Sequence, residues 1–387
     1  MTTAIIKVWI FFLNIINSFI KCFKTKDKIT FISRQSNSIN ADFKLIIESL
    51  KERIPECKII VLCKKLEGGL FQKAMYFFHI FKQMWHIETS RMVILDSYCI
   101  PISVLKHKKN LVVLQIWHAI GVMKKSGYGV LDKKQDNKQE LTDKRTSKIA
   151  ELMKMHQNYD YILCSSENCK EALAEVFNYP ISSFFVCPLP RVDLLRDKDL
   201  IEETQKKILK EYPLLKEKEN IVYAPTYRDD EKDLNIKLVE LAENIDFLKY
   251  NFIVKAHPKS KIVEMNNETI VDQRFTTLQM LSIADYVICD YSSVIYEAAI
   301  MKKPLYFFVF DFDEYSQTTD LYIDYKKEAP GVISENAKDI IKGIMNKEFD
   351  LNEVSAFLNK YVYLKEESCV SILVDFIKTK LDAVKGV

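Results

Sequence analysis

Short, mainly apolar segments recur along most of this chain and alternate with stretches of helical character. A strand whose hydrophobicity is continuous rather than alternating is buried on both faces, as in a parallel sheet covered by helices. The segments are 29–33, 58–63, 92–95, 111–116, 161–164 and 184–187 in the first half, and 221–224, 252–256, 269–271, 286–289 and 305–309 in the second. The pattern predicts an α/β protein with doubly wound, Rossmann-like sheets.

The chain is too long for one hydrophobic core, because 387 residues exceed the usual size of a single domain. A charged stretch over 196–218 separates the two halves. We therefore expect a first Rossmann-like domain over 29–195 and a second over 196–365, facing each other across a cleft. Residues 366–387 show helical spacing of apolar positions and predict a C-terminal helix that packs back on the first domain or stands apart from it.

The first 28 residues form a segment of their own. Residues 4–23 are strongly apolar, with polar side chains gathered on one helical stripe at Lys7, Asn14, Asn17, Ser18 and Lys21. Apolar runs are shorter than the roughly 20 residues of a spanning helix, and further lysines follow. We interpret 1–28 as a membrane-associating amphipathic helix that lies in the cytoplasmic face of a membrane, with lysines near anionic headgroups. A helix packed on the domain and a tilted single span are the alternatives.

Composition narrows the class of ligand. The net charge of +3 is small for this length and argues against a nucleic-acid binder. Nine cysteines occur without a CxxC pair, which indicates reduced thiols, and eight glycines occur without a dinucleotide-binding fingerprint. Asp229 and Asp230 are adjacent acids, for which a solvated loop is a better explanation than a metal site. We expect that no cofactor is required, with a divalent cation as the alternative.

Polar side chains suited to phosphate follow several predicted strands. Segment 286–289 runs into Asp290, Tyr291, Ser292 and Ser293 and then into a helix. Free N–H groups and the helix dipole at such a turn favour a phosphate or diphosphate, although helix capping is the alternative role of either serine. Other strand ends carry Trp117-His118, Arg191, Thr226 with Arg228, and Lys255 with His257. Ligands of open α/β sheets bind at these ends, so a phosphoryl-bearing substrate is expected.

Together these motifs resemble the CDP-glycerol glycerophosphotransferases of teichoic acid assembly. The resemblance rests on Trp117-His118, Leu189-Pro190-Arg191, Tyr223-Ala224-Pro225-Thr226 with Arg228-Asp229, Lys255 with His257-Pro258, and Asp290-Tyr291-Ser292-Ser293. It spans roughly 111–333 in order and includes Lys303-Pro304, 311–315 and 322–325. The sequence departs from the common pattern of the family at Ala119, Tyr227, Glu297 and Thr319-Asp320.

The resemblance implies a fold, an activity and roles for the site residues. It implies a GT-B-like architecture, peripheral (monotopic) attachment to the cytoplasmic membrane face, and transfer of glycerol phosphate from CDP-glycerol to a hydroxyl of a lipid-linked saccharide or polyol-phosphate acceptor, releasing CMP. His118 matches the family's histidine proposed as the base, and His257 matches the histidine of its His-Pro motif, so these two are our candidate catalytic residues. Our candidates for donor and phosphate binding are Thr226, Arg228, Lys255, His257, Ser292, Ser293 and Glu297. Our candidates for acceptor binding are Arg191, Lys124 and Lys125.

Other functions remain open to the sequence. A nucleotide-sugar GT-B glycosyltransferase would use the same diphosphate seat, and a CDP-ribitol ribitolphosphotransferase is a nearer variant. Outside the enzymes, the alternative is a non-catalytic membrane-bound scaffold that retains a nucleotide-binding fold. The length suits a primase or short-chain transferase. The sequence makes no prediction of the oligomeric state.

Overall fold

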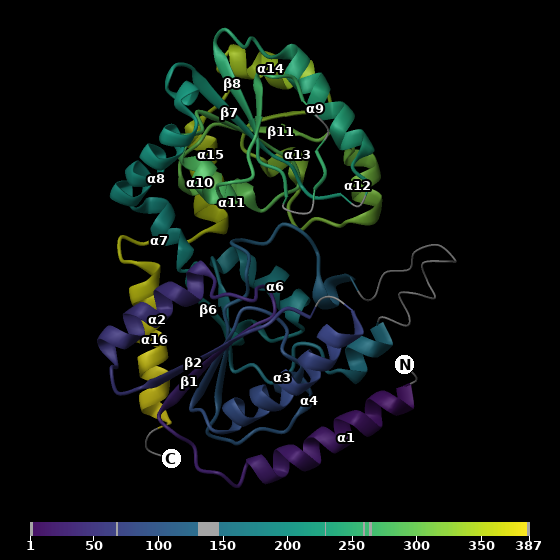
Figure 1. Ribbon diagram of the computed structural model, residues 1–387, viewed down its shortest axis with the longest axis vertical. Helices are drawn as coiled ribbons and strands as arrows, with labels where there is room; N and C mark the ends of the chain where they lie inside the picture. Colours follow the sequence, from purple (N-terminus) through teal and green to yellow (C-terminus); the bar gives the residue numbers. More distant parts are fainter. Residues whose placement is uncertain are drawn as a thin grey trace. The chain divides into compact units, whose positions relative to one another are not determined.

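A computed structural model describes residues 3–66, 69–130, 147–228, 230–257, 260–262 and 265–384 (Figure 1). Internal contacts divide the chain into two compact units. Unit 1 comprises Met1–Ala119, Ser126–Arg191 and Lys365–Val387, and unit 2 comprises Ile120–Lys125 and Val192–Leu364. The division between the halves thus falls after Arg191, whereas the sequence places it after residue 195. It also includes a short excursion at 120–125 that the sequence does not predict.

Unit 1 is built on a parallel sheet with the strand order β2-β1-β3-β4-β5-β6. Its strands are β1 (Lys28–Ser33), β2 (Lys58–Cys63), β3 (Met92–Leu95), β4 (Val112–Gln115), β5 (Tyr161–Cys164) and β6 (Phe184–Val186). Every residue of β1, β3 and β4 is buried, which is why these segments are mainly apolar. The chain reverses its direction of sheet growth between β1 and β3, the place where doubly wound sheets bind ligands.

Helices and short 3-10 turns cover this sheet. They are α1 (Thr3–Ile20), α2 (Ala41–Arg53), α3 (Leu70–Glu88), α4 (Ile100–Val104), η1 (Gly127–Val130), η2 (Glu167–Cys169), α6 (Lys170–Phe177), η3 (Ile181–Ser183) and α16 (Cys369–Ala383). The C-terminal helix α16 lies against α2, where Arg53 bonds Asp375 and Ser371 at 2.8 Å each. It belongs to unit 1, whereas the preceding helix α15 (Leu351–Tyr361) belongs to unit 2.

Helix α1 packs on unit 1 through part of its polar stripe. The Asn17 amide is 1% exposed and donates to Glu88 Oε1 at 2.9 Å and to the Lys106 carbonyl at 3.1 Å. Asn14 donates to the Val104 carbonyl at 3.3 Å. Leu13 is buried in the small apolar cluster between α1, α3 and α4. The two asparagines therefore face the protein because they bond carbonyl groups that α1 covers.

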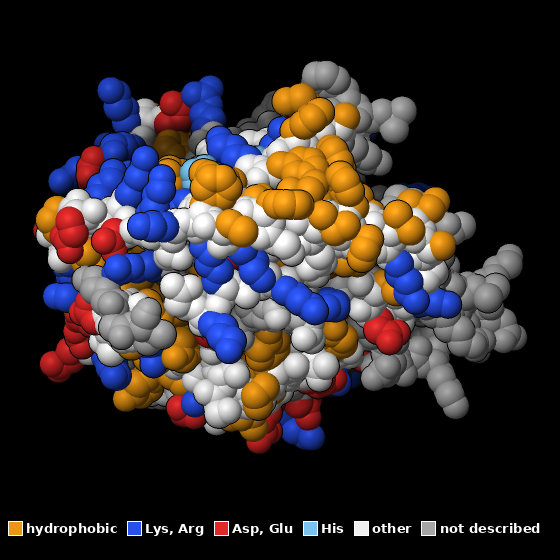
Figure 2. Space-filling view, turned by 90° about the horizontal axis from the view of Figure 1, so that it is seen from below, with side chains coloured by type: hydrophobic (Ala, Val, Ile, Leu, Met, Phe, Trp, Pro, Cys, Tyr) orange, Lys and Arg blue, Asp and Glu red, His pale blue; other side chains and the backbone are white. Residues whose placement is uncertain are grey.

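The opposite face of α1 is apolar and exposed. Phe11 and Phe19 are 68% and 70% exposed, and Phe78 on α3 is 65% exposed. Figure 2 shows apolar side chains gathered on the face seen from below, with Lys and Arg beside them. By length and composition α1 is also able to cross a membrane. An exposed apolar face of this extent marks an interaction surface.

Unit 2 contains a second parallel sheet with the order β12-β11-β10-β7-β8-β9. Its strands are β7 (Glu219–Ala224), β8 (Tyr250–Val254), β9 (Thr269–Val271), β10 (Tyr286–Cys289), β11 (Leu305–Phe308) and β12 (Val332–Ser334). Its helical segments are α7 (Arg191–Arg196), α8 (Lys198–Glu211), η4 (Pro213–Lys216), α9 (Lys232–Asn244), α10 (Thr277–Ile283), α11 (Val294–Ile300), α12 (Phe312–Thr318), α13 (Tyr325–Glu328), α14 (Ala337–Met345) and α15 (Leu351–Tyr361). The switch in direction here lies between β7 and β10.

The segment 120–125 is held in unit 2 by backbone pairing. Lys125 N donates to the Asp320 carbonyl at 2.8 Å, and Tyr296 Oη donates to the Val122 carbonyl at 3.1 Å. Gly121 has φ +66°, and a Cβ at this position would lie 2.4 Å from the Tyr296 ring. Only glycine satisfies both conditions, so this turn depends on it.

Candidate active site

His118 lies in unit 1 beyond the carboxyl end of β4. Its Nδ1 is 3.1 Å from the main-chain carbonyl oxygen of Asp96, which follows β3, and 3.4 Å from Gln35 Nε2, which follows β1. A carbonyl oxygen only accepts, so the Asp96 contact favours the tautomer with the proton on Nδ1 and leaves Nε2 with a lone pair. Burial lowers the pKa of His118; the Asp96 bond opposes this and the Arg191 charge adds to it. The ring is therefore neutral at neutral pH and able to accept a proton.

Trp117 adopts a strained backbone that orients the histidine. Its φ is +62°, a left-handed conformation that costs a bulky residue on the order of 1–3 kcal/mol. Its N–H donates to Gln115 Oε1 at 2.9 Å, and its ring centroid is 4.0 Å from that of His118 and 5.0 Å from that of Phe177. The buried Gln115 in turn donates to the Ser97 carbonyl at 3.1 Å. These contacts hold the turn in the shape that presents His118.

Arg191 is paired with an acid that the sequence analysis did not identify. Its main-chain N and its Nε donate to the two carboxylate oxygens of Asp42 at 2.8 Å each. Its Nη2 lies 3.3 Å from the His118 carbonyl oxygen. Asp42 is 1% exposed in the first turn of α2. From the sequence, Arg191 is a candidate for acceptor binding. In the structure the Asp42 pair compensates much of the Arg191 charge.

Asp96 is a second unit 1 acid that sequence reasoning missed. Its carboxylate accepts from Asn40 Nδ2 and Ser97 Oγ at 2.8 Å each, and burial raises the pKa of the carboxyl. Asp96 follows a predicted buried strand directly, so the strand-end signal that selected His118 was present here too. Asp42 gave no comparable signal, because an acid in the first turn of a helix is common.

In unit 2 the ends of β7, β10 and β11 meet at a buried carboxylate, Asp290. Thr226 donates to it from Oγ1 at 2.6 Å and from its backbone N at 2.9 Å. Arg228 donates from Nη1 to Asp290 at 2.9 Å and from Nε to Asp311 at 2.7 Å. Tyr291 adds a hydrogen bond to Asp311 at 3.1 Å and stacks on Tyr315. The sequence named Thr226 and Arg228 as separate phosphate ligands; the structure joins them in one network.

The Arg228 guanidinium is compensated inside this network. Its side chain is 11% exposed and lies between the carboxylates of Asp290 and Asp311. Burial alone would lower the pKa of Arg228, but the bond to Asp311 and the charge of Asp290 raise it. Its fork is therefore occupied by protein carboxylates, which marks Arg228 as a support of the strand ends.

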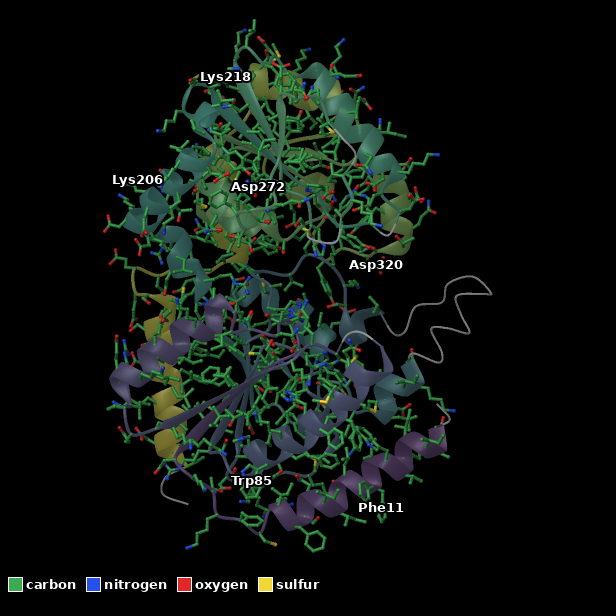
Figure 3. The ribbon with its side chains drawn as sticks, in the orientation of Figure 1. Phe11, Trp85, Lys206, Lys218, Asp272 and Asp320 are labelled. Carbon is green, nitrogen blue, oxygen red and sulfur yellow. The ribbon has the colours of Figure 1, made fainter. Side chains whose placement is uncertain are left out.

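Lys255, which directly follows β8, is also paired with a buried carboxylate. Its Nζ is 2.9 Å from Asp272 Oδ2 and 3.1 Å from the Asp272 carbonyl oxygen, and the side chain is 9% exposed. Asp272 is labelled in Figure 3. His257 follows on the same loop, is exposed, and lies with its ring centroid 5.2 Å from that of Tyr227. The neighbouring Pro258, like Asp229, falls outside the described residues.

The turn from β10 into α11 carries the paired serines. Ser293 occupies the N-cap position without a side-chain capping hydrogen bond, and Ser292 Oγ is 3.4 Å from the Val294 N–H. Capping therefore does not account for the Ser293 hydroxyl. Glu297 lies one turn further along α11 and is only 7% exposed, so it is not a solvated surface acid.

Lys124 lies in unit 2, although the sequence analysis grouped it with the first domain. Its Nζ is 5.3 Å from the Tyr315 ring centroid. Burial lowers the pKa of Lys124, and the nearby Asp290 opposes the shift. Within the described residues its ammonium has no hydrogen-bond acceptor in range. Lys125 lies with its Nζ 5.2 Å from the ring of Tyr322.

The fold and the two strand-end clusters define a class of protein. Two doubly wound α/β units, one presenting a neutral histidine and the other a serine turn beside compensated cations, constitute a GT-B-like architecture with the chemistry of a phosphate-handling transferase. A family model described as CDP-glycerol:poly(glycerophosphate) glycerophosphotransferase matches residues 14–379, and the chain belongs to this family. The family and the GT-B-like fold expected from the sequence are confirmed.

Named relatives and a solved structure agree with this assignment. The chain is 28% identical to a teichoic acid ribitol-phosphate primase of Bacillus spizizenii over 92% of both chains. It is 25% identical to a teichoic acid glycerol-phosphate primase of Bacillus subtilis over 96% of both. Its fold matches the structure of the wall teichoic acid polymerase TagF with a TM-score of 0.73 at 20% identity, covering 95% of this chain and 93% of that one.

Proposed function

We propose that this protein transfers glycerol phosphate from CDP-glycerol to a hydroxyl of a lipid-linked saccharide or polyol-phosphate acceptor in teichoic acid synthesis, and releases CMP. The family assignment over 14–379 supports this most strongly. The serine turn at the sheet switch point of unit 2 supports a diphosphate donor there. A variant of TagF that was solved after a soak with CDPG shares this fold, which agrees with such a donor.

In the proposed reaction, the acceptor hydroxyl attacks the glycerol-bearing phosphorus of CDP-glycerol. Nε2 of His118 takes the hydroxyl proton as the new P–O bond forms, and the bond to the bridging oxygen breaks with CMP as the leaving group. Ser292, Ser293, His257 and Lys124 bind the donor phosphates. Arg228 and Lys255 do not contact the donor in this proposal. They hold the strand ends in place through their ion pairs with buried carboxylates. Charge neutralisation and positioning supply most of the remaining acceleration.

The donor is the point at which a second function must be tested. The similarity to a ribitol-phosphate primase favours CDP-ribitol as the second candidate donor. We expect CMP release to be faster with CDP-glycerol than with CDP-ribitol when both are offered with defined lipid acceptors. Mass spectrometry of the products gives the transferred unit. Faster transfer of ribitol phosphate would reverse the donor assignment, and UDP release from a sugar nucleotide would replace the reaction class.

Lys124 is expected to bind the donor through its ammonium. Replacing Lys124 by methionine should weaken CDP binding about 10- to 100-fold, because one charge-assisted hydrogen bond is lost. Lys124→Arg should restore part of the affinity. Calorimetric titration with CDP measures both, and Lys125→Met serves as the control, with an effect of less than about 3-fold because its charge lies over Tyr322. Equal losses in the two methionine variants would contradict a specific role for Lys124.

The proposed reaction needs no cofactor, and a divalent cation bound to the donor diphosphate is the alternative. Turnover after treatment with EDTA distinguishes them. Unchanged turnover is expected. A loss that Mg²⁺ restores would show that the donor is used as its metal complex.

We also propose that the protein attaches peripherally to the cytoplasmic membrane face through the outer side of α1. Figure 3 labels Phe11 on this helix, and Phe19 lies two turns further along. Phe11→Ser with Phe19→Ser should lower partition into phosphatidylcholine vesicles by at least about 100-fold, since each buried Phe contributes on the order of 1.5–3 kcal/mol. Leu214→Ser with Leu248→Ser removes two exposed apolar side chains of unit 2 and is the control in flotation. Unchanged flotation of the phenylalanine variant would refute attachment by α1.

A further inference from the structure

Beside α1, unit 1 contains a groove of about 900 Å³ that the proposed reaction does not use. It lies between one side of α1, residues 104–106 and residues 148–154. Its lining includes five lysines: Lys7, Lys21, Lys106, Lys148 and Lys154. Glu151 is the acid among the lining residues, so positive charge is in clear excess. Such an excess around one groove favours an anionic ligand.

The lysines of this groove are available to a ligand. Lys7, Lys106, Lys148 and Lys154 are exposed, and the described ion pairs of the protein do not include them. Lys21 is half-buried and donates to the Lys106 carbonyl oxygen at 3.2 Å. Their charges are therefore not compensated within the described part of unit 1, in contrast to Arg191, Arg228 and Lys255.

One wall of the groove is apolar and continues onto the exposed face of α1. Ile10, Phe11 and Ile15 line the groove, and Phe11 and Ile15 are also 68% and 43% exposed. At 100° per residue, Ser18 lies on α1 between Phe11 and Lys7, whereas Ile10 lies on the far side of Lys7 and Asn14. A ligand in this groove thus meets ammonium groups and hydrogen-bonding groups at one side and an apolar surface at the other. That combination fits an amphiphile with an anionic head better than a soluble anion.

We propose that this groove binds the phosphate headgroup of an anionic membrane phospholipid, with the acyl chains leaving along Phe11 and Ile15. The proposal rests on the attachment of α1 to the membrane and adds a defined lipid site to it. The polar stripe then has two uses: Asn14 and Asn17 fix α1 on unit 1, while Lys7 and Lys21 face the headgroup. A helix held in this way presents its apolar face and its lysines at the depths where acyl chains and phosphates lie.

The test uses the full chain and a phosphatidylglycerol with short acyl chains, below its micelle-forming concentration. We expect saturable binding of one lipid per chain in calorimetry. Lys106→Gln with Lys148→Gln should weaken it about 30-fold, because each lysine near a lipid phosphate contributes about one factor of five. Lys24→Gln with Lys26→Gln removes the same charge from exposed lysines outside the groove and should change it less than about 3-fold.

Several outcomes would overturn the lipid site while leaving the proposed attachment intact. One is flotation on phosphatidylcholine vesicles without saturable binding of the short-chain lipid. Another is an equal loss in both lysine pairs, which would mean general electrostatic attraction. Binding of farnesyl diphosphate but not of phosphatidylglycerol would assign the groove to a polyprenyl carrier. Competition by inorganic phosphate alone, at equal strength, would show that the apolar wall has no role. Failure of flotation on every vesicle would instead refute attachment itself.

Discussion

Replacing His118 by alanine is expected to lower turnover about 10²- to 10⁴-fold, the usual contribution of a general base. Affinity for CDP should stay nearly unchanged, because the proposed donor groups belong to unit 2. His257→Ala is the matched comparison: this histidine lies in unit 2, and its loss should lower both turnover and CDP affinity. Single-turnover rates with CDP-glycerol and calorimetric titration with CDP give the two quantities. Near-normal turnover of the His118 variant would exclude it as the base.

The pH dependence of the wild-type enzyme tests the same role of His118 as a neutral general base. Burial lowers the pKa of His118 below its ordinary value of 6.5, so the neutral, proton-accepting form persists as the pH falls through 6.5. We therefore expect the acid limb of kcat/KM to lie below pH 6.5. His118→Ala should lose this limb, whereas Lys124→Met should keep it at a lower plateau. A limb at or above the ordinary value would contradict the buried, neutral base.

Most of the sheet structure was predictable because strands of a parallel sheet covered by helices are mainly apolar, without the alternation of a half-exposed strand. Segments 58–63, 92–95, 161–164, 269–271 and 286–289 match the observed strands residue for residue. Strand β12 (Val332–Ser334) was missed, although it has the same length and the same half-buried pattern as the correctly predicted β9. The excursion of 120–125 into unit 2 was also missed. It depends on backbone pairing with residues near 320, and pairing partners leave no periodicity in a sequence.

The candidate site was predictable only up to the strand ends. The rule that parallel strands deliver ligands at their carboxyl ends selected His118, Thr226 and Ser293. It did not separate cations available to a ligand from cations already paired. Arg191 pairs with an acid 149 residues away, and Lys255 with one 17 residues away, so only the tertiary structure determines these partners. Lys124 shows the converse, because the fold leaves its ammonium without an acceptor within the described residues.

Arg228→Met is expected to destabilise unit 2 by about 3–5 kcal/mol, the cost of leaving buried carboxylates without their counter-charge. Asp290 is fully buried and accepts from Arg228 at 2.9 Å, and Asp311 accepts from it at 2.7 Å. The methionine side chain fills similar space but donates no hydrogen bond to either acid. Urea unfolding followed by hydrogen exchange at β7 and β10 measures the loss within unit 2. The stability of Arg228→Lys should lie between that of the wild type and that of Arg228→Met, because lysine keeps the positive charge but lacks the planar guanidinium.

A second substitution tests whether Arg228 stabilises unit 2 by compensating the buried carboxylates. If the carboxylates cause the instability, Asp311→Asn in the Arg228→Met background should recover part of the lost stability, since one uncompensated charge is removed. The coupling energy should be on the order of 1–3 kcal/mol. Lys124→Met should behave in the opposite way, with CDP affinity lowered and stability nearly unchanged. If Arg228→Met instead unfolded like the wild type and lost only CDP affinity, Arg228 would be a direct phosphate ligand. The network around Asp290 would then be rearranged by the donor rather than built to hold the strand ends.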